Sequence, residues 1–303
     1  MDTQGARLGG LEHLVDARIR HRHGQLDKRR GDGAERLERG LPLGRIEFVS
    51  QRARVALAMF SVGVLAFLFA EVFVHGLEIV EHRFDALHDG SGSLPVGLLL
   101  GLLFGAGFTA GLAGLALIER RMRNVKAPPI AGGATDALTV EQSEMLSDEV
   151  TARARALRTG MAIAAAIGLH NFAEGLAIGV SANTGEIGLA TVLIIGFAVH
   201  NATEGFGIVG PLGDVRPSWR WLAVAGLVGG GPVFLGAMVG YNVSSQPLEL
   251  LFYAVSAGAI LYVIGEVWTA MRRLGHRELG LLMLSAGVTL GAMTELVIAY
   301  GGG

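Results

Sequence analysis

Apolar residues occur along the chain in seven long blocks separated by short polar segments. Each block has roughly 17 to 25 residues, the length of a helix that crosses the hydrocarbon core of a bilayer. Because backbone polar groups in lipid must be satisfied within the segment, blocks of this length favour helices over strands. The predicted spans are residues 54–77, 95–118, 158–181, 187–209, 219–242, 248–270 and 279–300. The pattern therefore predicts an all-α, polytopic membrane helical bundle.

Basic residues are distributed unevenly among the connecting segments. Residues 1–54 hold twelve of the 25 lysines and arginines, and residues 119–158 hold seven. The segments that alternate with the basic ones contain one basic residue or none. Since basic loops stay in the cytoplasm, the alternation predicts a cytoplasmic N-terminus, an outside C-terminus and an odd number of spans. We expect a multi-pass protein in the lipid bilayer of the cell (inner) membrane.

Two regions outside the spans are expected to lie in the cytoplasm. Residues 1–53 mix acidic and basic side chains with scattered glycine, which is typical of a charged, flexible tail. They have no apolar core of signal-peptide length, so no cleavable signal is expected. Residues 119–157 are expected to form a loop with a short helix in EQSEMLSDEV, and Glu119 to be a charge at the membrane boundary. Residues 54–300 then form the transmembrane domain.

Composition narrows the classes of function. The formal net charge is −2, so nothing in the charge balance points to nucleic acid as a partner. The chain has no cysteine, which excludes disulfides, thiolate metal ligands and cysteine nucleophiles. Any metal site must therefore do without thiolate ligands.

One motif occurs twice inside the predicted spans, as HNFAEG at residues 170–175 and HNATEG at residues 200–205. Ionisable groups in a membrane helix cost about 2.5–3.5 kcal/mol each on insertion scales, so they are candidates for function. In each copy the histidine and the glutamate are four residues apart, about 40° around the helix axis. The asparagine lies about 100° from the histidine, so all three side chains fit on one face.

The two spans are joined by a short turn, so they run antiparallel and can be neighbours. Facing copies offer two imidazoles, two carboxylates and two amide oxygens, which suit Zn²⁺ or a related cation such as Fe²⁺, Mn²⁺, Co²⁺ or Cd²⁺. The two glutamates neutralise the charge of the ion. Without thiolates the ion should exchange readily, as transport requires. The metal is then the cargo, and no cofactor is expected.

Four other interpretations of the histidines stay open at this point. Each His–Glu pair can be a local hydrogen bond in a helical bundle, or His170 and His200 can be the axial ligands of a haem. A seven-helix membrane zinc hydrolase would need a third intramembrane histidine, and after His200 only His276 follows, in a basic loop. A non-transporting metal sensor would bind the ion without moving it.

At the two HN-x-x-EG motifs the sequence resembles the ZIP (zinc/iron-regulated transporter-like) family of divalent metal transporters, over residues from about 54 to 300. The resemblance implies a helical bundle with an inverted repeat, alternating access, no enzymatic activity and metal uptake toward the cytoplasm. It also makes a homodimer an expectation. By position in the motifs, the implied metal ligands are His170, Asn171, Glu174, His200, Asn201 and Glu204.

The chain departs from the family pattern in several places, which suggests a divergent prokaryotic branch. Ala173 and Thr203 stand where the motifs usually have proline. In VGGGPVFLG, Gly231 stands before Pro232 in the place of a glutamate that helps to bind a second metal, so a mononuclear site is expected. The GGGP stretch should break or kink its span. Seven spans are predicted where the family generally has eight.

Further polar residues mark a candidate ion path. Glu71, His75 and Glu78 form a stripe at the outer end of the first span, which we interpret as an entry mouth that concentrates cations or, alternatively, as a solvated helix end. Glu266, in YVIGEVW, lies near the cytoplasmic end of its span. It is a candidate release-side ligand or a hydrogen-bond acceptor within the bundle.

Overall fold

The computed structural model describes residues 50–123, 140–243 and 245–300, and within these ranges every long element is a helix. Seven helices are long and apolar enough to cross a membrane, which confirms the predicted all-α bundle. The elements are α2 (Gln51–His88), α3 (Leu94–Arg123), α4 (Val140–Asn183), α5 (Ile187–Val209), the 3₁₀ turn η2 (Gly210–Leu212), α6 (Trp219–Asn242), α7 (Gln246–Arg272) and α8 (Arg277–Tyr300).

Two helices extend well beyond their apolar blocks. The helix α2 continues through polar residues to His88 and stops before Gly90, whose φ is +75°. The helix α4 already begins at Val140, so EQSEMLSDEV is its first part and not a separate short helix. No glycine or proline interrupts residues 140–159, so nothing ends the helix at the edge of the apolar block. Residues 140–157 were expected in a loop and are helical, whereas residues 124–139 lie outside the described ranges.

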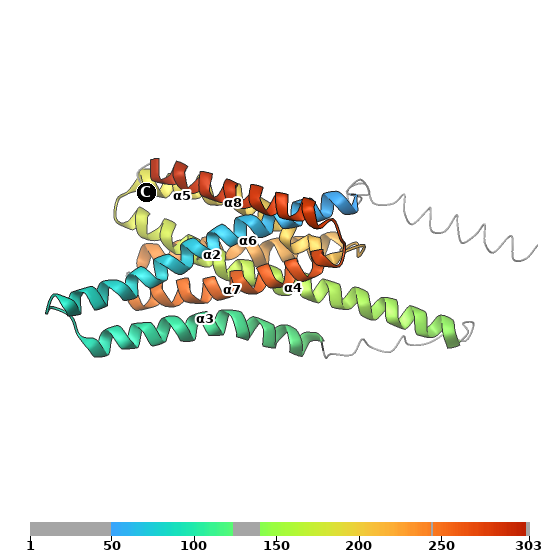
Figure 1. The fold of residues 1–303 in the computed structure, drawn as a ribbon, viewed down its shortest axis with the longest axis horizontal. Helices are drawn as coiled ribbons and strands as arrows, with labels where there is room; N and C mark the ends of the chain where they lie inside the picture. The colour runs from blue at the N-terminus through green and yellow to red at the C-terminus, as the bar shows by residue number, and fades with distance from the viewer. Residues whose placement is uncertain (1–49, 124–139, 244, 301–303) are drawn as a thin grey trace, which may run out of the picture. The chain divides into compact units, whose positions relative to one another are not determined.

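Successive spans run in opposite directions, so the polar termini of the helices gather at two ends of the bundle (Figure 1). The end on the right of Figure 1, here called the basic end, carries Arg54, Arg120, Arg216, Arg272 and Arg277. The opposite end, here called the acidic end, carries Glu81, Asp85, Asp89, Glu186 and Glu249, together with the basic Arg83. The assignment of the basic end to the cytoplasm stays a prediction.

The outer faces of the bundle are apolar. Leu102 on α3 and Leu227 on α6 are each 71% exposed, and Phe234 on α6 is 68% exposed. Large exposed apolar side chains recur along these helices and along α8. Such surfaces are stable in lipid rather than in water. The chain is a multi-pass membrane protein with seven candidate spans.

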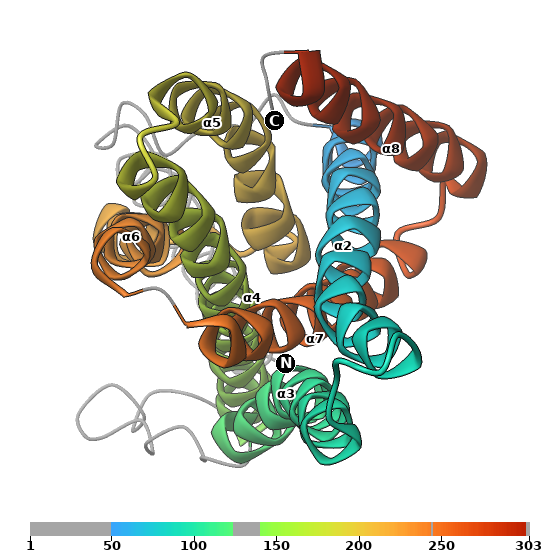
Figure 2. The ribbon, with the colours of Figure 1, turned by 90° about the vertical axis from the view of Figure 1, so that its left-hand side faces the viewer.

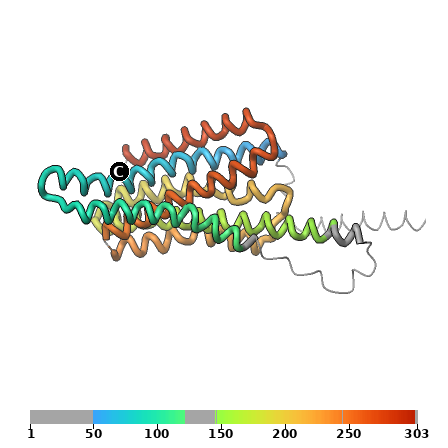
Figure 3. The backbone as a smooth tube through the Cα atoms, turned by 60° about the horizontal axis from the view of Figure 1, so that its bottom comes forward, coloured from blue at the N-terminus to red at the C-terminus, as the bar shows by residue number. Residues whose placement is uncertain are grey.

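The inner helices pack through small residues, which brings backbones into direct contact. A Cβ on Gly175 of α4 would lie 2.0 Å from the carbonyl oxygen of Val233 on α6, and one on Gly236 of α6 would lie 2.0 Å from that of Phe172. This close approach locks α4 to α6 over much of their length. Figures 2 and 3 show α4 and α7 in the interior of the bundle, with α8 at its periphery.

Candidate metal centre

The two HN-x-x-EG motifs lie in the membrane-spanning parts of α4 and α5, which are joined by a short turn. The structure brings residues of the two copies together in the interior. Five of the six predicted ligands are buried and Asn201 is half-buried. The buried five are His170, Asn171, Glu174, His200 and Glu204.

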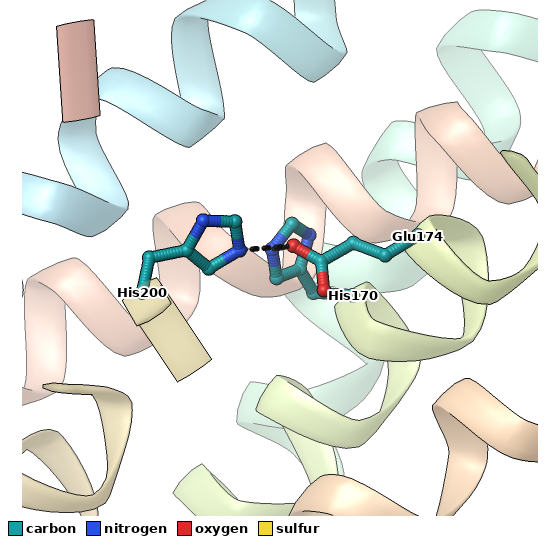
Figure 4. A group of neighbouring side chains, drawn as sticks. All are labelled: His170, Glu174 and His200. Atoms are coloured by element: carbon teal, nitrogen blue, oxygen red, sulfur yellow. Dashed lines mark hydrogen bonds and ion pairs between the residues drawn. The ribbon is translucent and has the colours of Figure 1, made fainter. Parts of the chain in front are cut away.

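Three of these residues form a compact group. The ligand atoms of His170, Glu174 and His200 all lie within 4.8 Å of one another, from two different helices (Figure 4). One oxygen, Glu174 Oε1, lies 2.5 Å from His200 Nε2 and 3.0 Å from His170 Nε2. The two imidazole rings are stacked with centroids 6.4 Å apart. Two imidazole nitrogens and a carboxylate that converge on one point are a ligand set that suits Zn²⁺ and related divalent ions.

The second carboxylate lies beside this group without joining its hydrogen bonds. Glu204 is 1% exposed, and its Oε1 is 3.8 Å from His170 Nε2. Neither of its oxygens has a hydrogen-bond partner. A buried carboxylate in this condition is costly unless a cation or another donor reaches it. Glu204 is therefore placed to meet a positive ion at the edge of the three-residue group.

The two asparagines have different partners. Asn201 Nδ2 donates to Glu174 Oε2 at 3.1 Å, so it orients the central carboxylate. Asn171 Nδ2 donates to the carbonyl oxygen of Gly229 on α6 at 2.9 Å. The amide oxygen of each asparagine is buried without a hydrogen-bond partner. Both oxygens thus remain available to accept from a hydrated ion or to bind it.

The contact from Asn171 reaches α6 beside its proline. The expected break at GGGP is not found, since α6 is one continuous helix with Pro232 inside it. Proline lacks the N–H that would donate to the carbonyl four residues earlier, which is that of Val228. The neighbouring carbonyl oxygen, that of Gly229, accepts a hydrogen bond from the Asn171 side chain on α4. The GGGP stretch is therefore braced by α4.

A residue that the sequence reasoning missed holds the first histidine. Ser256 of α7 is fully buried, and its Oγ is hydrogen-bonded to His170 Nδ1 at 3.1 Å. A partner on one ring nitrogen fixes the ring and leaves the other nitrogen facing the metal. The only signal in the sequence is a single serine in the apolar run AVSAGAILYV.

The predicted path residues are not members of the three-residue group, but Glu71 lies near enough to interact electrostatically with His170 and His200. Glu71 is half-buried on α2 and interacts with Glu295 of α8. His75 and Glu78 are exposed, and the His75 ring packs edge-on against Tyr253 at a centroid distance of 5.8 Å. Glu266 is half-buried on α7, ten residues beyond Ser256, which is about 15 Å toward the basic end.

Glu119, expected as a charge at the membrane boundary, is buried within the bundle and only 1% exposed. Thr159 of α4 donates to Oε1 at 3.0 Å, and the Tyr262 hydroxyl of α7 donates to Oε2 at 2.9 Å. The sequence does not show these hydrogen bonds, because ERRMR looks like the start of a charged segment and the two partners lie 40 and 143 residues away. Glu119 thus ties α3 to α4 and α7.

Paired imidazoles and carboxylates in the interior of seven spans define a polytopic membrane protein with a candidate intramembrane cation site. A family model described as ZIP Zinc transporter matches residues 133–265, which include α4, α5, α6 and most of α7. The matched region, a little under half of the chain, is similar to ZIP zinc transporters. This confirms the resemblance found in the sequence. A search of curated proteins gave no match.

Proposed function

We propose that the protein carries Zn²⁺, or a related divalent ion, into the cytoplasm through a single site on α4 and α5. The observation that carries the proposal is the convergence of two imidazoles on one carboxylate oxygen beside buried oxygens without hydrogen-bond partners. The proposed ligands and ligand-orienting residues are His170, Asn171, Glu174, His200, Asn201 and Glu204.

Charge balance favours a divalent ion. Two ionised glutamates offset the charge of one such cation, which is otherwise expensive to hold in a low-dielectric interior. The glutamate that helps to bind a second metal in the family is absent here, because Gly231 precedes Pro232. We therefore propose one transported ion at this site rather than a metal pair.

Binding should also displace a proton. In the short contact at 2.5 Å, an imidazole N–H of His200 donates to Glu174. A metal ion needs the lone pair of that same nitrogen, so the proton must move to the other ring nitrogen or leave the site. Cation binding is thus coupled by geometry to a change in the position of the His200 proton. Nothing in this argument requires a proton gradient as the driving force.

The proposed path combines the inward movement that the family resemblance implies with the predicted orientation of the chain. If the basic end faces the cytoplasm, ions enter from the acidic end, where Glu71, His75 and Glu78 lie on α2. Glu266, toward the basic end, would then lie on the release side. A homodimer, which the family resemblance implies, stays a prediction.

The test is uptake of ⁶⁵Zn²⁺ by proteoliposomes that contain the purified protein. We expect saturable uptake that the double substitution Glu174→Ala with Glu204→Ala abolishes. A matched control is Glu186→Ala, which removes an exposed carboxylate in the α4–α5 turn. Undiminished uptake by the folded double variant would refute the site. Metal binding without uptake by the wild-type protein would favour the sensor interpretation.

A further inference from the structure

Hydroxyl side chains on the helices of this protein mostly hydrogen-bond to their own helix. Six of them donate to the carbonyl oxygen four residues earlier, the usual way for a hydroxyl in an apolar helix to be satisfied. The six are Thr109, Ser181, Thr191, Thr289 and Thr294 within helices and Thr184 directly after the end of α4.

The buried serines divide into three cases. Within the described ranges three serines are buried, and Ser181 follows the rule by donating to Ala177. Ser256 instead holds His170 of the metal centre. Ser61 of α2 is 0% exposed, and its Oγ has no hydrogen-bond partner. A buried hydroxyl without a partner costs free energy, so it suggests a ligand that arrives during function.

Ser61 faces α5 one turn beyond the metal centre. A Cβ on Gly207 would lie 3.1 Å from Ser61 Oγ, so the hydroxyl lies against the α5 backbone at that residue. Gly207 follows Glu204 by three residues, which places it on the same face of α5 and about 4.5 Å nearer the basic end. Glu204 is the carboxylate with two unpartnered oxygens.

Beyond Ser61 the contact between α2 and α5 becomes apolar and tight. A Cβ on Gly210 would lie 2.8 Å from the Cβ of Ala58 and 3.8 Å from the Met271 side chain. Ala58 and Met271 are 1% and 3% exposed. An ion that moves from Glu204 toward the basic end therefore passes Ser61 before this closed apolar contact.

We propose that Ser61 Oγ and the Glu204 carboxylate form a second, transient site for the same divalent ion on the basic-end side of the centre. This inference rests on the proposed function. The ion binds two protein oxygens there and regains water as the α2–α5 contact opens. Glu204 serves both sites, which explains why its oxygens lie at the edge of the three-residue group rather than inside its hydrogen bonds.

The first test separates movement from binding. In Ser61→Ala we expect the affinity of the purified protein for Zn²⁺ to stay within about twofold of wild type, while maximal uptake falls about tenfold, as for loss of one charge-assisted contact. Ser181→Ala, which removes a buried hydroxyl that is bonded to its own helix, should leave both unchanged. Wild-type uptake in Ser61→Ala would overturn the inference.

The second test changes the softness of the proposed ligand atom. A serine with a purely structural role would not make metal preference depend on this change. Ser61→Cys keeps the size of the side chain but replaces a hard oxygen with sulfur, which prefers Cd²⁺. We expect the ratio of Cd²⁺ to Zn²⁺ uptake to change about threefold or more relative to Ser181→Cys. An unchanged ratio would contradict the transient site. Loss of Zn²⁺ binding in Glu174→Ala, together with an unchanged ratio here, would refute this inference alone and leave the proposed function intact.

Discussion

The two copies of the motif have nearly the same residues and different surroundings. In the first copy, on α4, His170 is held by Ser256, Asn171 by Gly229, and Glu174 by His200 and Asn201. In the second copy, on α5, Glu204 has no hydrogen-bond partner, and the oxygen of Asn201 has none.

The helices that carry the two copies also differ in how much of their surface is buried. In the apolar stretch of α4, 67% of the residues are buried, against 28% in α5. The helix α4 lies between α6 and α7, whereas α5 presents large apolar side chains such as Ile195, 59% exposed, to lipid. One copy is thus fixed by neighbouring helices, and the other brings its ligands from a less constrained helix. The comparison teaches that sequence symmetry in a site does not imply equal roles.

The largest difference in stability is expected between alanine substitutions of the two glycines that end the motifs. Gly175→Ala would put a Cβ 2.0 Å from the Val233 carbonyl oxygen, so α4 and α6 must separate. We expect a loss of about 3 kcal/mol or more, at the upper end of overpacking costs. The equivalent Gly205→Ala meets no atom within 4 Å and should be neutral or stabilising by up to about 1 kcal/mol, because alanine favours the helix.

The measurement is thermal unfolding of each purified variant in the same detergent. Equal losses for Gly175→Ala and Gly205→Ala would show that the two copies are equally packed. That result would remove the distinction between a fixed and a less constrained copy.

The carboxylates should respond with opposite signs in the metal-free protein. Glu174 is bonded to His200 and Asn201, so Glu174→Gln should destabilise by about 1–3 kcal/mol through lost charge-assisted contacts. Glu204 is buried without a hydrogen-bond partner and has only a long 3.8 Å contact with His170, so Glu204→Gln removes a poorly compensated charge and should stabilise by about 1–3 kcal/mol. Both variants should lose the additional stability that Zn²⁺ gives the wild-type protein.

Unfolding temperatures measured with excess chelator and then with excess Zn²⁺ separate the two effects. A destabilised metal-free Glu204→Gln variant would mean that Glu204 is held by the protein itself. The second copy would then be as constrained as the first.

The sequence predicted the spans and the motif pairs because both depend on local pattern. Apolar block length locates a membrane helix, and the four-residue spacing places His170 and Glu174 on one face whatever surrounds them. The ends of α2 and α4 were missed, because a helix stops at a turn residue and not at the edge of the apolar block. Hydrophobicity alone does not contain that information.

The local sequence pattern could not predict which residues contact the site residues. Ser256 lies 86 residues from His170, and Gly229 lies 58 residues from Asn171. Such contacts depend on which helix faces pack together, and that is set by close approaches such as Gly236 against Phe172. Ser61 shows the same limit, since a serine in an apolar helix is usually satisfied by its own backbone.

The smallest expected effect concerns the residue that fixes the first copy. Ser256→Ala removes the partner of His170 Nδ1 and frees the ring to rotate, without removing any proposed ligand. Loss of an outer-shell partner typically lowers metal affinity 10- to 100-fold, and we expect about tenfold here because α4 is otherwise held by α6. Isothermal titration with Zn²⁺ measures this change in affinity.

The comparison variant is Phe197→Leu, which alters the ring packed on His200 at 5.4 Å. Since α5 has no equivalent brace, this variant should change the affinity for Zn²⁺ by less than about threefold. If Phe197→Leu proves the more damaging of the two, the His200 side of the site is the constrained one and the roles of α4 and α5 are reversed.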